Sequence, residues 1–120
     1  MRKYLVFISL ILFPLVTAYA GEADVTNVKV VKLADGAYRF DVTLSHSDEG
    51  WEHYADKWDV VGPDNTVFGT RTLYHPHVDE QPFTRSLSGV KIPPGIGKVT
   101  IRAHDSVHEY GGTAVTVVLP

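Results

Sequence analysis

Apolar and polar residues alternate one by one in residues 37–45, and this is the clearest pattern in the chain. Tyr38, Phe40, Val42 and Leu44 fall on one side of an extended backbone, and mostly polar residues fall on the other. A period of two predicts a strand with one face in a core and the other in water, which is typical of antiparallel sheets. Residues 98–104 repeat the pattern and predict a second strand of the same kind.

Turn-forming residues divide the rest of the chain into further short strands. Asp35-Gly36 is a dipeptide favoured in tight hairpins, and proline with asparagine or glycine marks the turns at 62–65 and 93–97. Together these patterns predict seven strands, at residues 24–33, 37–45, 57–61, 66–73, 83–92, 98–104 and 113–119. Seven short strands in a chain of about 100 residues indicate an all-β protein, a seven-stranded antiparallel β-sandwich.

Residues 47–58 are open to two interpretations. Trp51, Tyr54, Ala55 and Trp58 share helical spacing, which favours a short helix. Gly50 weakens that helix, and the polar character of the segment equally fits a loop that leads into a strand.

The first twenty residues have the pattern of a signal peptide. Arg2 and Lys3 are followed by an apolar stretch at 4–16, and Ala18-Tyr19-Ala20 is a small-x-small cleavage motif. The apolar stretch is shorter than the roughly 20 residues that span a bilayer. We therefore expect cleavage before Gly21, a single domain at 21–120, and a periplasmic or secreted protein without a membrane anchor.

The composition of the mature chain limits which ligands it can bind and which groups it can bind them with. Without Arg2 and Lys3, nine basic residues remain against fourteen acidic ones, a net charge of −5. Such a charge disfavours nucleic-acid binding, because phosphate backbones are repelled. The chain has no cysteine, and its one methionine is Met1. Thiolate and thioether ligands are thereby excluded, which leaves six histidines as the unusual feature.

The strand pattern, with Trp58 in the third strand, resembles that of immunoglobulin-like and fibronectin-type-III-like domains. This resemblance implies a two-sheet sandwich with loops at both ends, and the cysteine pair of true immunoglobulins is missing. Residues 75–112 also resemble a group of small secreted bacterial proteins without an assigned activity, and that resemblance implies no particular function.

All six histidines lie in or beside alternate connections between the predicted strands. Consecutive antiparallel strands reverse direction, so the connections at 45–56, 74–82 and 105–112 should meet at one end of the sandwich. The connections at 34–36, 62–65 and 93–97 should meet at the other end and carry no histidine. The sequence therefore predicts a histidine-rich end.

Imidazole and carboxylate groups together form the ligand set of zinc or copper(II), so we expect a non-enzymatic protein that binds a divalent transition metal. His75 and His77 lead the candidates, because residues two apart on extended backbone point the same way. We expect binding to depend on this pair. The full candidate set is His75, His77, His108, His53, His104 and His46. The alternative is that these histidines only brace the loops through hydrogen bonds.

A second hypothesis is a metal-free module that binds a protein or glycan partner through the same loops. Its candidate contacts are the aromatic residues Trp51, Tyr54, Tyr74 and Tyr110. Catalysis is not expected, because no nucleophile motif surrounds Ser47 or Ser106.

Overall fold

Seven antiparallel strands make up the regular structure of residues 21–120, the part of the chain that this computed structural model describes. The predicted signal peptide, residues 1–20, lies outside the described residues. The strands are β1 (Asp24–Lys32), β2 (Tyr38–Ser45), β3 (Ala55–Val61), β4 (Val67–Thr72), β5 (Phe83–Val90), β6 (Lys98–Asp105) and β7 (Val115–Val118). All seven predicted strands are confirmed, with ends displaced by two residues at most.

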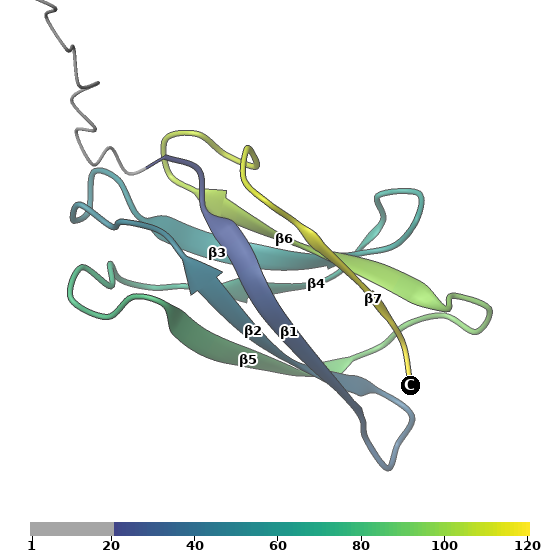
Figure 1. The fold of residues 1–120 in the computed structure, drawn as a ribbon. Coiled ribbons are helices and arrows are strands. Elements are labelled where there is room, and N and C mark those ends of the chain that lie inside the picture. The colour runs from purple at the N-terminus through teal and green to yellow at the C-terminus, as the bar shows by residue number, and fades with distance from the viewer. Residues whose placement is uncertain (1–20) are drawn as a thin grey trace, which may run out of the picture.

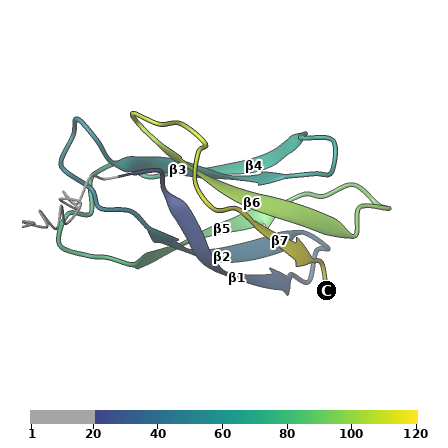
Figure 2. The ribbon, with the colours of Figure 1, turned by 45° about the horizontal axis from the view of Figure 1, so that its top comes forward.

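The strands form two sheets. One has the order β1-β2-β5 and the other has the order β4-β3-β6-β7, and every pairing is antiparallel. Figure 1 shows the strands running along the length of the domain, and Figure 2 shows β3 and β4 in one layer above β2 and β5 in the other. The predicted all-β sandwich is confirmed.

The core lies between the sheets and is built from the residues that the alternation placed inward. Phe40, Trp58 and Ile101 are completely buried. Their neighbours two residues away, such as Val42 and Val60, are buried as well. Burial of large apolar side chains stabilises the sandwich by about 1.5–3 kcal/mol for each side chain.

Residues 46–54 form a loop and not a helix. Gly50 adopts a φ of 114°, a conformation that L side chains rarely reach, and it forms an isolated bridge with His53. This turn interrupts the helical spacing. Strand β3 then begins at Ala55, two residues earlier than predicted, because Ala55 pairs with Asp105 of β6. Among residues 21–120, no helix is long and apolar enough to cross a membrane.

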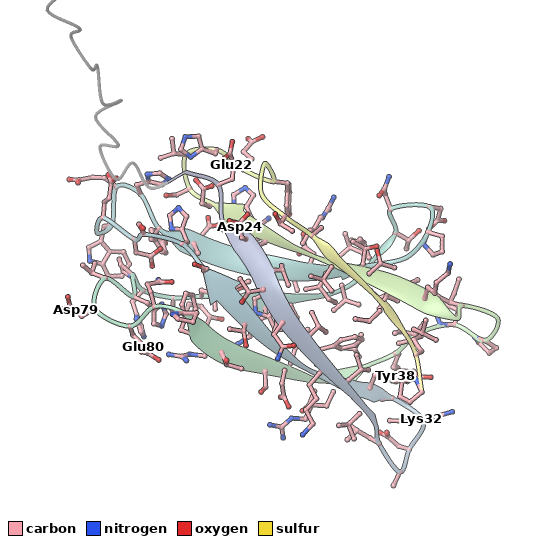
Figure 3. All side chains as sticks on the ribbon, viewed as in Figure 1. Glu22, Asp24, Lys32, Tyr38, Asp79 and Glu80 are labelled. Carbon is pink, nitrogen blue, oxygen red and sulfur yellow. The ribbon has the colours of Figure 1, made fainter. Side chains whose placement is uncertain are left out.

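Three connections lie at one end of the sandwich, as the strand count predicts, and the loop after β2 is hydrogen-bonded to both of the others. We call this the histidine end and define it as residues 21–23 together with the loops 46–54, 73–82 and 106–114. Figure 1 shows these loops on the left, and the hairpins after β1, β3 and β5 on the right. In Figure 3, Asp79 and Glu80 mark the histidine end, while Lys32 and Tyr38 mark the opposite end.

Candidate metal centre

His46, His53 and Asp105 form a buried group at the histidine end. His46 follows β2 directly, His53 lies in the loop before β3, and Asp105 is the last residue of β6. Each offers one ligand atom, and these atoms lie within 4.8 Å of one another. All three residues are buried. The antiparallel sheets thus bring together three groups that are up to 59 positions apart in the chain.

Asp105 is completely buried, and its two oxygens differ sharply. Oδ1 accepts hydrogen bonds from the backbone N–H groups of Val107 at 2.9 Å and His108 at 2.7 Å, and from Nε2 of His53 at 3.0 Å. Oδ2 has no hydrogen-bond partner among residues 21–120. Burial alone raises the pKa of Asp105, but the two backbone hydrogen bonds and the nearby histidines outweigh it and lower the pKa. Asp105 is therefore a carboxylate at neutral pH.

His46 is held at both ring nitrogens. Nδ1 lies 2.5 Å from Oδ1 of Asp48, and Nε2 lies 2.8 Å from the carbonyl oxygen of Gly21. Burial lowers the pKa of His46, but the hydrogen bond and charge of Asp48, with the Gly21 carbonyl, raise it overall. The contact with Asp48 fixes the ring orientation, and an ion at Nε2 would replace the proton that Nε2 now shares with the Gly21 carbonyl. Histidine ligands in metalloproteins are commonly oriented by a carboxylate in this way.

Asp48 connects the loops of the histidine end through hydrogen bonds. Besides His46, it accepts hydrogen bonds from the backbone N–H of Ala55 at 3.0 Å and of His77 at 2.7 Å. Burial raises the pKa of Asp48, but these hydrogen bonds outweigh burial and lower it. The carboxylate thereby connects the loop after β2 with β3 and with the loop after β4.

His108 extends the group toward solvent. The ring centroid of His53 lies 4.9 Å from that of His46 on one side and 4.9 Å from that of His108 on the other. Nδ1 of His108 lies 3.4 Å from Oδ1 of Asp105, and the side chain is 39 % exposed. Three imidazoles therefore stand in a row from the interior to the surface, with Asp105 beside two of them.

His75 and His77 face one another, as the His-x-His spacing predicts, with ring centroids 4.7 Å apart. They do not belong to the buried group. Nε2 of His77 accepts a hydrogen bond from Nη2 of Arg85 at 3.0 Å, and the His77 ring stacks on Phe83. Burial, followed by the positive charges of Arg85 and His75, lowers the pKa of His77. A guanidinium at this distance repels a cation, so this pair is the weaker of the two metal candidates.

His104 and Tyr110 lie apart from the group, on the outer face of the sheet that contains β6. Nδ1 of His104 contacts Asp56, and the ring packs edge-on against Tyr110. The Tyr110 hydroxyl donates to Asp59, and the guanidinium of Arg102 lies 4.1 Å from the Tyr110 ring centroid. These contacts form a cluster with a structural role, which holds the last loop against the sheet.

The other candidate aromatic residues are solvent-facing to different degrees. Trp51 is 67 % exposed and Tyr74 is 75 % exposed. Tyr54 is partly buried and packs edge-on against Trp51 at 5.7 Å. Trp51 therefore does not complete the core beneath the loop.

Asp105 is not among the ligands predicted from the sequence, and His46 stands last among the predicted histidines. Both residues can be found by extending the alternation of inward-facing positions beyond the apolar part of each strand. The inward positions Val99, Ile101 and Ala103 continue to Asp105, just as the inward face of β2 continues past Leu44 to His46. A polar residue at an inward position must find partners in the interior, which makes it a stronger site candidate than a residue in an exposed loop.

Comparison with known proteins yields one relative to report. No family model matches the chain, and no solved structure matches it. The chain is 41 % identical over 96 residues to a protein of Halomicrobium mukohataei named "Putative lipoprotein". The match covers 80 % of this chain and 47 % of that protein, so the chain spans about half the length of this relative. The relative is named a lipoprotein, and the 120 residues of this sequence contain no cysteine.

Proposed function

We propose that this protein binds one divalent transition metal ion, zinc or copper(II), through His46, His53 and Asp105, with His108 as the fourth side-chain donor. The observation that carries the proposal is Oδ2 of Asp105, an ionised oxygen that is completely buried and unpaired among residues 21–120. A buried charge is costly unless it is paired or coordinates a metal. Two buried imidazoles within 4.8 Å supply the rest of a coordination shell.

The donor set fits these ions. Imidazole and carboxylate suit zinc and copper(II), whereas copper(I) prefers the sulfur ligands that residues 21–120 lack. With Zn–N distances of about 2.0–2.1 Å, two ligand atoms of a tetrahedral site lie roughly 3.3 Å apart. The His53 ring lies against the Asp105 carboxylate, with Nε2 3.0 Å from Oδ1, so the two side chains are close enough to share an ion, Asp105 through its unpaired Oδ2. His46 would bind through Nε2, which would exchange its contact with the Gly21 carbonyl for the ion.

The role we propose is non-enzymatic: the exported protein carries, buffers or senses the ion. A complete shell of protein ligands favours storage over catalysis, because catalytic metal sites keep a position open for substrate. Ser106, the serine beside the group, supports this assignment. Its Oγ accepts a hydrogen bond from the backbone N–H of Tyr54 and so has a structural partner. The name of the relative supports export.

The test is metal analysis of the exported, tag-free protein after treatment with a chelator and dialysis, followed by zinc and copper(II) titrations. We expect one ion per chain at micromolar affinity or better. Asp105→Asn keeps an oxygen that can accept the two backbone hydrogen bonds but removes the charge, and it should weaken binding at least tenfold.

Two matched variants locate the site. His104→Gln removes an imidazole outside the buried group and should leave the affinity unchanged. The double variant His75→Ala/His77→Ala should also retain binding. Absence of binding in the wild-type protein would refute the proposed function. Loss of binding in the double variant alone would move the site to the His75–His77 pair.

A second candidate function rests on the exposure of Trp51 and Tyr74. With the exposed Val78 and Val107, they lie in the three loops of the histidine end. Large exposed apolar side chains on loops often mark a binding surface. This candidate is a module that binds a protein or glycan. It differs from the metal-binding proposal in one measurable result. Binding of the partner should persist in the presence of a chelator and should be lost in the double variant Trp51→Ala/Tyr74→Ala.

A further inference from the structure

The N-terminal backbone of the described chain lies against the metal group. The carbonyl oxygen of Gly21 is 2.8 Å from Nε2 of His46, the nitrogen that we assign to the ion. Covalent geometry keeps the nitrogen of a residue within about 3.6 Å of its own carbonyl oxygen. The main-chain nitrogen of Gly21 therefore lies within about 6.4 Å of Nε2 of His46.

This position is fixed by close packing of residues 22–24 against the last loop. Ala23 is buried, and a Cβ at Gly112 would lie only 2.0 Å from its carbonyl oxygen. Asp24 accepts a hydrogen bond from the backbone N–H of Thr113 at 2.7 Å. Figure 3 shows Glu22 and Asp24 along this part of the chain. The segment that delivers Gly21 to the histidines is thus held by specific contacts.

The chemistry of the Gly21 nitrogen depends on whether the preceding residue is present. In a precursor it is an amide, whose lone pair is delocalised and does not bind a divalent ion. After cleavage behind Ala18-Tyr19-Ala20 it is an α-amino group, whose lone pair can bind a divalent ion in place of a proton. The α-amino nitrogen and the carbonyl oxygen of one residue can chelate an ion in a five-membered ring.

We propose that the α-amino group of Gly21, created by removal of residues 1–20, is a ligand of the same metal ion. This inference rests on the proposed function and deepens it, because it makes tight binding a property of the processed chain. The Gly21 amine then joins His46, His53, Asp105 and His108 as a fifth donor.

The test compares two forms of the chain. One is the exported protein, whose N-terminus is identified as Gly21 by intact mass. The other begins at Ala20, so that the Gly21 nitrogen is an amide. Zinc and copper(II) affinities are measured for both at pH 7.5, with thermal unfolding in chelator as the control for folding. We expect the form beginning at Ala20 to bind at least tenfold more weakly, with an unchanged unfolding temperature.

A second measurement does not alter chain length. The α-amino group of the exported protein is selectively acetylated near pH 6.5, where lysine side chains remain protonated. This should cause the same loss of affinity. The copper(II) electron paramagnetic resonance spectrum should lose one nitrogen ligand.

The outcomes separate the two proposals. If all forms bind equally tightly and His53→Gln abolishes binding, the proposed function stands and the role of Gly21 is refuted. If no form binds, both are refuted. An exported protein whose mass shows a different N-terminus also overturns the inference.

Discussion

Asp48 and Asp105 are both buried carboxylates at the histidine end, but their hydrogen bonding assigns them different roles. Both oxygens of Asp48 accept hydrogen bonds, from the His46 ring and from two backbone N–H groups. Asp105 concentrates its hydrogen bonds on Oδ1 and leaves Oδ2 without a partner among residues 21–120. Asp48 therefore acts as a positioning residue for His46, and Asp105 retains an oxygen for a ligand.

His77 makes a pH-dependent contribution to stability that can be measured separately from the metal. Its ring faces Arg85 and His75, which with burial lower its pKa, and Glu80 and Asp48, which oppose them. The folded pKa lies below the ordinary value of 6.5, so the unfolded chain takes up the proton first as pH falls. The stabilising contribution of neutral His77 is thus present above pH 6.5 and is lost as pH falls through the folded pKa.

Replacing His77 should remove this dependence. In His77→Gln the amide oxygen can still accept from Arg85, but the side chain does not titrate. Urea unfolding in chelator between pH 8 and pH 5 should show that the wild-type protein loses more stability than the variant as pH falls. The raised pKa of His46 gives the opposite slope in both proteins, so it cancels in the difference. Parallel stability curves would contradict the prediction.

At the scale of the strands, the two-residue alternation of apolar and polar positions predicts which features of the fold can be known from the sequence. Alternation in β2 and β6 locates the buried faces, and reversal of successive strands places the histidines at one end. The group itself depends on how each loop closes. The turn at Gly50 and the left-handed conformation of Glu109, with a φ of 59°, decide which side chains meet. Such conformations are set by contacts between loops, and local propensity does not reveal them.

The glycine pair after β6 gives an element-scale prediction. A Cβ at Gly112 would meet the backbone of Ala23, whereas a Cβ at Gly111 would meet the flexible side chain of Glu22. Gly112→Ala should therefore displace the N-terminal segment, destabilise the protein by about 1–3 kcal/mol, and weaken metal binding. Gly111→Ala is the matched control and should have the smaller effect on both. Denaturant unfolding in chelator and zinc titration measure the two quantities.

On the scale of the whole molecule, the two sheets form a rigid frame that carries the group at one end. In one sheet, His46 follows β2, and the segment that begins at Gly21 leads into β1. In the other sheet, His53 precedes β3, and Asp105 is the last residue of β6. An ion bound here would connect both sheets. Because the unfolded chain has no preformed site, such an ion would stabilise the folded state as a whole.

This coupling predicts the thermal behaviour of the protein. A ligand present at one hundred times its Kd stabilises the folded state by about 2.7 kcal/mol. In a domain of about 100 residues, that corresponds to a rise in Tm of roughly 10–20 °C. We expect zinc to produce such a rise in the exported wild-type protein, and a chelator to reverse it. Asp105→Asn should abolish most of the rise, because the ion then lacks its only carboxylate ligand within the group. An equal rise in both proteins would show that the ion binds elsewhere and does not join the two sheets at Asp105.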